Sequence, residues 1–317
     1  MRDALRFLLD RVPEARPLDG GGELLERAPA PLDRPRTLSA LILEGTTLRP
    51  KRIRGPASTA FGAFLDGIQR SRVALHLPGG VPVVVASVAA VIRRRRDRRL
   101  VTWDQDARRK LYLPLALVRD GARLGAELEQ VVVDTSQPFG GDDGPDSRHP
   151  LALLERAVHF AQADRERLEI ALAERWCADE STPLFIDGGI SGSERLATSR
   201  TAVGVVKSHR RLYAENDGLA IVFGLQRGER TSVFRVESSR RTSVASWYLR
   251  LRDPAGHDPM WGLVRVEIPD GPGAPERADE VSRWILAEVT PLSLPDARWD
   301  KMVYGIRDCE EFLRAVG

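Results

Sequence analysis

The sequence predicts a mixed α/β fold in which a large sheet is flanked by helices. Short Val-rich runs separated by turn residues fill the first half, a long amphipathic helix follows, and more apolar runs come after it. This order of strands, helix, strands and final helices is typical of a mixed α/β domain. We predict that domain over residues 59–317, after an N-terminal helical and irregular extension over residues 1–58. The chain of 317 residues, 42% of them hydrophobic, is long enough to bury a sizeable core.

The predicted extension begins with a short amphipathic helix. The segment MRDALRFLLDRVPEAR carries charges within its apolar run, which argues against a signal peptide. A stretch rich in Pro and Gly follows, and residues 38–48 suit a helix and a loop equally well. We expect the extension to contact a partner protein or a second copy of the chain.

Cysteine content and hydropathy indicate where the protein works. The two cysteines, Cys177 and Cys309, form no CxxC pair, so a structural zinc site is not expected. A reduced cytoplasmic chain is the plainer interpretation, and a disulfide is the alternative. The longest apolar run, Val81 to Ile92, is too short to cross a bilayer, so we expect no membrane association.

The first half of the domain is predicted to form a group of strands. FGAFLDGI at 61–68 and RVALHL at 72–77 are apolar runs, and VPVVVASVAAVI at 81–92 follows the turn PGG. Runs rich in β-branched residues on either side of a short turn indicate an antiparallel hairpin. Further strands are predicted at 100–103, 111–118 and 131–135.

The second half is predicted to begin with a helix at roughly 149–177. Six apolar residues recur there at helical spacing and form one buried stripe. They are Leu154, Val158, Ala161, Leu168, Leu172 and Trp176. Strands are then predicted at 184–190, 201–209, 219–225, 232–236, 245–251 and 263–268, and the last helices at 276–289 and 305–315.

Two of the predicted strands deliver an Asp that is followed by Gly. They are FLDG at 64–67 and FIDG at 185–188. An unpaired carboxylate is unfavourable in a buried strand, because removing its charge from water costs free energy. At the end of a strand the carboxylate could instead meet a cation, and the Gly lets backbone or metal approach closely. Asp66 and Asp187 side by side would give Mg²⁺ or Mn²⁺ the oxygen ligands that these ions prefer. A strand-ending Asp-Gly turn is the alternative.

A third carboxylate is expected from the long helix that precedes the second Asp strand. The candidates are Glu166 and Glu169. Counting about 100° per residue, Glu169 lies at the edge of the apolar stripe, whereas Glu166 should point to solvent. We therefore predict Glu169 as the ligand, with an ordinary boundary Glu as the alternative. Two metal ions held in this way could stabilise the attacking and leaving oxygens in phosphodiester hydrolysis.

Four motifs, in their order and spacing, resemble the NurA nucleases. The motifs are FLDG at 64–67, RERLE at 165–169, FIDGG at 185–189 and VGVVKSH at 203–209. The resemblance spans roughly residues 60–317. It implies an RNase H-like mixed sheet related to the PIWI nuclease domains, and 5′-to-3′ exonuclease and single-strand endonuclease activity on DNA. It also implies a homodimer and a hexameric HerA-type ATPase partner, acting in DNA end resection or in defence against phage.

The resemblance also implies a closing residue from the C-terminal helix, and here the sequence departs from the family. The family often places a His after a Tyr-Pro, whereas Tyr304 is followed by Gly305 and the helix carries no His. We carry the position over to Asp308, since an Asp can also supply an oxygen ligand. Asp296 and Asp300 are the alternatives, and a first-turn acid favoured by the helix dipole is the non-functional interpretation of Asp308.

Basic residues could bind the phosphates of the substrate. Lys207 follows the apolar strand AVGVV and could hold a phosphate or stabilise developing charge. The dense basic run would offer a phosphate-binding surface that Arg210 could extend. That run begins with Arg93, Arg94, Arg95 and Arg96. The alternative is a charged edge that blocks unwanted strand pairing. His209 could shuttle a proton or serve a structural role.

The leading interpretation is a metal-dependent DNA nuclease with Asp66, Asp187, Glu169 and Asp308 as ligands of two Mn²⁺ or Mg²⁺ ions. The second interpretation is an RNase H-like module that binds nucleic acid or a partner protein without cutting. A guide-dependent PIWI-like protein is a third, but the chain looks too short for guide-binding domains. No GxxxxGK[ST] motif occurs, which excludes a P-loop ATPase.

Overall fold

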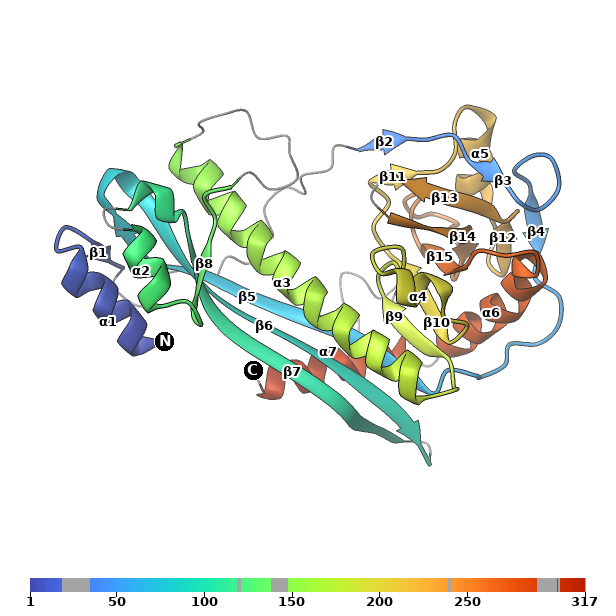
Figure 1. The fold of residues 1–317 in the computed structure, drawn as a ribbon. Coiled ribbons are helices and arrows are strands. Elements are labelled where there is room, and N and C mark those ends of the chain that lie inside the picture. Colours follow the sequence, from blue (N-terminus) through green and yellow to red (C-terminus); the bar gives the residue numbers. More distant parts are fainter. Residues whose placement is uncertain are drawn as a thin grey trace.

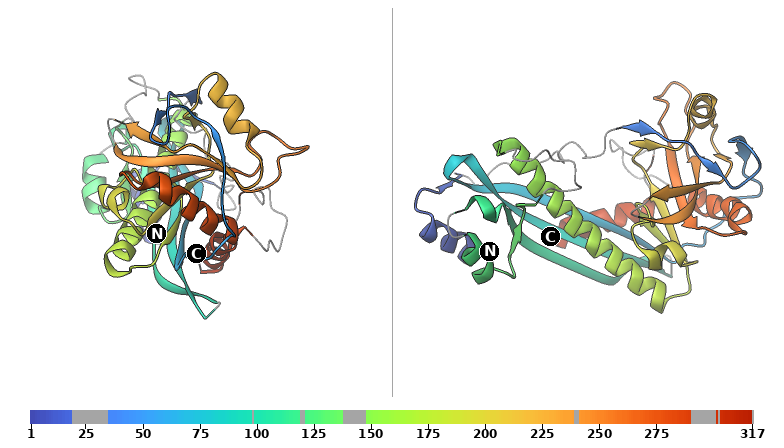
Figure 2. Two further views of the ribbon diagram at one scale, coloured as in Figure 1. Left: turned by 90° about the vertical axis from the view of Figure 1, so that its right-hand side faces the viewer. Right: turned by 45° about the horizontal axis from the view of Figure 1, so that its top comes forward.

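The computed structural model describes residues 1–18, 35–97, 99–118, 121–137, 148–238, 241–289, 301 and 303–316. The molecule is elongated. Three long strands and helix α3 (Pro150–Asp179) form an arm, and most of the shorter strands fold with α4 (Glu194–Thr198) and α6 (Ala274–Glu288) into a rounder body (Figures 1 and 2). The mixed α/β fold with one large sheet flanked by helices is confirmed.

One mixed sheet runs through both parts of the molecule. Its central order is β7-β6-β5-β9-β10-β15-β14-β13. Strands β5, β9 and β10 are parallel to one another, and the flanking pairs are antiparallel. The bounds are β5 (Ala63–Leu77), β6 (Val81–Arg96), β7 (Arg99–Leu113), β9 (Leu184–Asp187), β10 (Ala202–Val206), β13 (Phe234–Ser238), β14 (Arg241–Arg250) and β15 (Leu263–Pro269).

The arm strands are longer than the sequence predicts. The runs at 61–68 and 72–77 belong to the single strand β5, because β6 pairs with it along almost its whole length. In the same way, 100–103 and the start of 111–118 belong to β7, which ends before Pro114. Pro has no backbone N–H to donate a hydrogen bond to a neighbouring strand, so the strand ends and a short 3₁₀ segment, Leu115–Leu117, follows. Helix α2 (Gly121–Glu127) was not predicted, and β8 (Val132–Asp134) lies within the predicted strand at 131–135.

In the body, one predicted strand is a helix. Residues 219–225 lie almost entirely in α5 (Asp217–Gly224), because a short apolar run does not by itself distinguish a strand from a helix. The other predicted strands of the second half overlap β9, β10, β13, β14 and β15. The three predicted helices correspond to α3, α6 and α7 (Tyr304–Val316).

The described residues before 59 take part in the sheet. After α1 (Arg2–Arg11), the strand β1 (Arg16–Pro17) pairs with β5. Further on, β3 (Leu41–Ile42) pairs with β13, and β4 (Pro50–Arg52) pairs with β12 (Glu229–Thr231). A two-stranded sheet joins β2 (Arg36–Thr37) to β11 (Arg211–Leu212). Residues 38–48 form bends around β3 and no helix. Of the two predicted alternatives, the loop is therefore the one that the structure shows. The segment set apart as an extension is therefore joined to the domain by backbone pairing.

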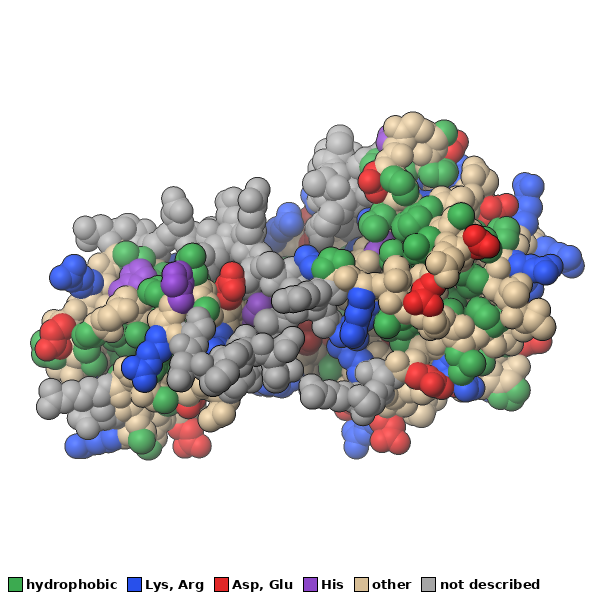
Figure 3. All heavy atoms as spheres, turned by 90° about the horizontal axis from the view of Figure 1, so that it is seen from above, with side chains coloured by type: hydrophobic (Ala, Val, Ile, Leu, Met, Phe, Trp, Pro, Cys, Tyr) green, Lys and Arg blue, Asp and Glu red, His purple; other side chains and the backbone are tan. Residues whose placement is uncertain are grey.

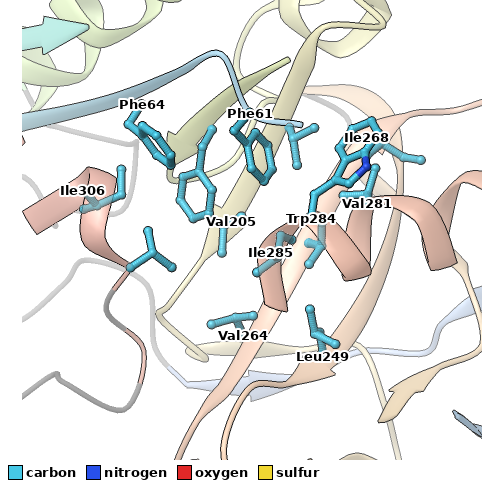
Figure 4. Close-up of a cluster of buried hydrophobic side chains, with 14 of the residues drawn as sticks. Phe61, Phe64, Val205, Leu249, Val264, Ile268, Val281, Trp284, Ile285 and Ile306 are labelled. Atoms are coloured by element: carbon cyan, nitrogen blue, oxygen red, sulfur yellow. The ribbon is translucent and has the colours of Figure 1, made fainter. Parts of the chain in front are cut away.

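Hydrophobic layers cover both faces of the central sheet. On one face, Leu168, Leu172 and Trp176 of α3 pack against Leu65 and Ile186. The other face carries α6 and α7. Figure 4 shows aromatic rings of this second layer, where Phe61 lies near Trp284 of α6 and Phe64 lies near Ile306 of α7. Both cysteines are free, and no described helix is long and apolar enough to cross a membrane.

Helix α7 approaches β5 closely because Gly305 has no side chain. A Cβ at this position would overlap the buried ring of Phe64. We expect Gly305→Ala to lower the free energy of unfolding by about 1–3 kcal/mol, the usual cost of overpacking a core. Urea denaturation followed by circular dichroism measures this. Gly271→Ala is the matched control, since a Cβ there meets no atom within 4 Å, and an equal loss in both variants would contradict the packing argument.

Candidate active site

The parallel pairing of β5 with β9 brings Asp66 level with Asp187. Leu65 is paired with Ile186, so the next residue of each strand occupies the same step of the ladder. Side chains at matched positions of neighbouring strands lie on the same face. The two carboxylates that the sequence singles out are therefore neighbours, delivered by adjacent strands.

Asp66 differs from the prediction in one respect, because it does not end its strand. It is the fourth residue of β5, which continues to Leu77. The strand that ends here is β9, whose last residue is Asp187. The sheet opens at this step because β5 runs on without β9, and the two carboxylates lie at the opening.

Asp66 is almost completely buried, with 6% of its surface exposed. One carboxylate oxygen accepts the backbone N–H of Gly67 at 2.8 Å. Burial raises the pKa of Asp66 well above its usual value, and the charge of Asp187 raises it further. Lys207 acts in the opposite direction, while Glu169 and Glu310 add to the increase. Three other acids therefore raise the pKa of the buried Asp66 carboxyl group, and Lys207 opposes them.

Glu169 reaches this site from α3, on the other face of the sheet. Gly67 makes this approach feasible, because a Cβ at position 67 would overlap the carboxylate of Glu169. Arg165, one turn earlier on the helix, donates to the same carboxylate at 2.7 Å. Burial raises the pKa of Glu169 to about 7; Arg165 opposes the shift, and the charges of Glu166 and Asp187 add to it. Glu166 lies on the exposed side of the helix.

Lys207 continues from the end of β10 and lies beside Asp187. Its Nζ atom is 2.7 Å from a carboxylate oxygen of Asp187. His209, two residues further, is buried, and one of its ring nitrogens lies 2.8 Å from the carbonyl oxygen of Leu263. Burial lowers the pKa of His209 to about 4, so the ring is neutral at neutral pH. This hydrogen bond gives His209 a structural role.

Helix α7 carries two acids to compare, the predicted ligand Asp308 and Glu310, and the position of Asp308 as a ligand stays a prediction. Asp308 pairs with Arg93 at 2.5 Å, whereas the charge of the buried Glu310 acts on Asp66. Helical spacing explains the difference. Glu310 falls within the buried stripe that includes Ile306 and Leu313, and Asp308 lies outside that stripe.

This periodicity is visible in the sequence and could have identified Glu310. The acid lies four residues after Ile306 and three before Leu313, which is the spacing of one helix face. The two alternatives to Asp308, which are Asp296 and Asp300, lie outside the described residues.

The arginines predicted to bind nucleic acid are mostly used inside the fold. Successive residues of β6 point to opposite faces. Arg93 therefore reaches Asp308 of α7, Arg95 reaches Glu288 of α6 at 2.6 Å, and Arg94 reaches Glu180 at 2.9 Å beyond the end of α3. These three ion pairs engage the guanidinium groups with acids of the fold, and the phosphate-binding surface stays a prediction. Of the remaining predicted contacts, Arg96 is exposed and Arg210 is half-buried.

The described His, Cys, Asp and Glu residues include no group of three or more that is arranged to hold a metal ion. Two of the acids are held in ion pairs, Asp187 with Lys207 and Glu169 with Arg165. The chemistry of the donors nevertheless fits a hard divalent cation. They are carboxylates around a buried Asp66, and a bound cation would relieve their mutual repulsion.

Comparisons with known proteins add little evidence about function to what the geometry of the site provides. No family model matches the chain, and no curated protein matches it. Among solved structures, the chain is similar to the NurA nuclease from Sulfolobus solfataricus. The identity is 9% and the TM-score is 0.45, over 87% of this chain and 81% of that one. A likeness at this level does not identify a function, so the site has to be judged on its own residues.

The raised pKa of Glu169 makes the stability of the metal-free protein depend on pH. The folded state binds this proton more tightly than the unfolded state, whose Glu titrates near 4.5, because the folded pKa is about 7. The resulting stabilisation is complete below pH 4.5 and is lost as pH rises through 7.

We expect Glu169→Gln to remove this pH dependence, because the neutral Gln resembles the protonated Glu at every pH. Above pH 7 the variant should be more stable than the wild type by on the order of 2 kcal/mol. Urea denaturation across this pH range, in chelator, measures the difference. Glu166→Gln is the control on the exposed side of the same helix, and identical pH profiles for wild type and Glu169→Gln would refute the assignment.

Proposed function

We propose that this chain is a divalent-metal-dependent nuclease that hydrolyses phosphodiester bonds in DNA. The observation that carries the proposal is the matched register of Asp66 and Asp187 where β9 ends. Glu169 from α3 and Glu310 from α7 complete the set, which we call the acid cluster. A buried concentration of carboxylates costs stability, and a cation-binding role gives it a physical reason.

The residues of the acid cluster suit phosphodiester chemistry. Bound Mn²⁺ or Mg²⁺, in our proposal two ions, would activate water and stabilise charge on the phosphate. Asp66 and Asp187 would be the central ligands, and Glu169 and Glu310 would approach from the two faces of the sheet. Lys207, already held beside the site by Asp187, is placed to contact a phosphate oxygen or developing negative charge.

The strand order supports an RNase H-like core, which we propose as the finer description of the fold. The order β7-β6-β5-β9-β10 places an antiparallel three-stranded group beside two parallel strands, and α3 connects the two sets. The motifs shared with NurA nucleases are the basis for three further proposals. These are 5′-to-3′ exonuclease and single-strand endonuclease activity, a homodimer, and a HerA-type ATPase partner in DNA end processing or phage defence.

A non-catalytic binding module is the second candidate. It is favoured by the ion pairs of Asp187 with Lys207 and of Glu169 with Arg165, which neutralise two acids without any metal. The two candidates make opposite predictions for cleavage.

The nuclease proposal predicts Mn²⁺- or Mg²⁺-dependent cleavage of labelled single- or double-stranded DNA. We expect Asp66→Asn and Asp187→Asn each to lower the initial rate by about 100-fold or more, because each removes charge from the centre of the site. Glu166→Gln, on the exposed side of α3, should retain the wild-type rate. Absence of metal-dependent cleavage by the wild type, or full activity of both Asn variants, would favour the binding module.

A second comparison separates the two acids of α7. Glu310→Gln should lower the cleavage rate, since Glu310 belongs to the acid cluster. Asp308→Asn should leave the rate near that of the wild type and lower stability by about 1 kcal/mol, because it breaks only the pair with Arg93. Rates and thermal unfolding measured on both variants test this, and the reverse pattern of rates would restore Asp308 as the site residue.

A further inference from the structure

Beyond Asp66, strand β5 has an edge that pairs with no strand among the described residues until Leu75, and we call it the free edge. On that side β5 pairs with β9 as far as Leu65 and with β1 only from Leu75 onward. From Asp66 to Val73, no strand among the described residues pairs with this edge. Unpaired N–H and C=O groups of a free edge are available to bind other molecules. The edge begins at the acid cluster, where the sheet opens.

Two arginines follow Asp66 along this edge and on the same face. Side chains alternate along a strand, so Asp66, Arg70 and Arg72 point to the face that carries α7. The contact of Arg70 with α7 supports this assignment, because its guanidinium donates to the carbonyl oxygen of Arg314 at 3.3 Å. At about 3.3 Å per residue, the two arginines lie roughly 13 and 20 Å from Asp66.

Arg70 keeps its charge available. It is exposed, and it has no carboxylate partner among the described residues. It differs in this respect from Arg93, Arg94 and Arg95, whose charges are neutralised by acids. Figure 3 shows the face of the molecule seen from above, where the coloured Lys and Arg side chains are dispersed among other residues and form no single basic patch. The position of an arginine relative to the acid cluster therefore identifies a candidate phosphate contact better than the local density of basic residues does.

We propose that the free edge of β5 from Asp66 to Val73 guides a nucleic-acid strand to the acid cluster. Arg70 and Arg72 contact phosphates of that strand upstream or downstream of the bond to be cut. The phosphates of a nucleic-acid strand are negative, and the two arginines are positive and lie along the strand that leads to the acid cluster. Charge complementarity therefore favours this partner. This inference rests on the proposed nuclease function for the location of the reaction, but the binding itself needs no metal and no cleavage.

The test measures binding of fluorescein-labelled single-stranded DNA to the full chain in chelator, by fluorescence anisotropy at several salt concentrations. Each lost phosphate contact should reduce the slope of log K against log salt by about 0.7. We expect this reduction for Arg70→Ala and for Arg72→Ala, and about twice this value for the double variant.

Arg109→Ala is the matched control. Arg109 is also exposed and on the same face, because Ser87 of β6 is paired with both Arg70 and Arg109, but it lies on β7, two strands from the free edge. Its loss removes the same charge, and the slope should stay within error of the wild type. An equal effect of Arg109→Ala and Arg70→Ala would overturn the proposal in favour of a general charge effect.

Three other results would also overturn it. One is a wild type that binds no DNA. Another is a double variant that loses thermal stability while its slope of log K against log salt is unchanged. This result would assign Arg70 only the structural role of bonding to the end of α7. The third is a changed elution volume in size-exclusion chromatography with unchanged DNA binding, which would assign the edge to a second copy of the chain. A reduced slope in a protein that does not cleave DNA would support the binding edge while removing the nuclease proposal, so the two failures are distinguishable.

Discussion

The burial of the Asp66 carboxyl group is the constraint on which the rest of the site depends. A carboxylate that is removed from water is unstable unless it gains a proton or a cation. The Asp66 side chain lies on the face of the sheet that carries α7, and the charges of Asp187, Glu169 and Glu310 raise its pKa further. Lys207 opposes them but is already paired with Asp187. The fold therefore disfavours the charged form of Asp66, and in the proposed nuclease a bound divalent cation would offset that cost.

The surrounding architecture explains how three other acids come near enough to Asp66 to raise its pKa. The end of β9 opens the sheet beside β5, so that Asp66 and Asp187 lie at an edge and are not enclosed within the sheet. Gly67 leaves room for Glu169 to approach from the α3 face. On the opposite face, Gly305 lets α7 settle on β5, which brings Glu310 toward Asp66. Each glycine thus permits a close approach that a side chain would prevent.

The arginines show that charge density in the sequence is a weak guide to a binding surface. Arg93, Arg94 and Arg95 connect β6 to elements on both faces of the sheet, so they hold the helices in place around the site. Arg70, which belongs to the proposed binding edge, is isolated in the sequence from that basic run. Exposure and the lack of an acidic partner among the described residues distinguish Arg70 from Arg93, Arg94 and Arg95, and both are properties of the folded chain.

The sequence by itself determined the features that depend on local pattern. Apolar runs that end in Asp-Gly identified Asp66 and Asp187, and helical periodicity located α3 and placed Glu169 at the edge of its buried stripe. Tertiary structure alone decided which strands merged into β5 and β7, that residues 219–225 belong to a helix, and how Arg93 and Asp308 are paired. Short-range patterns record which face of an element is buried. The identity of the element packed against that face depends on residues distant in the chain, and local periodicity contains no information about them.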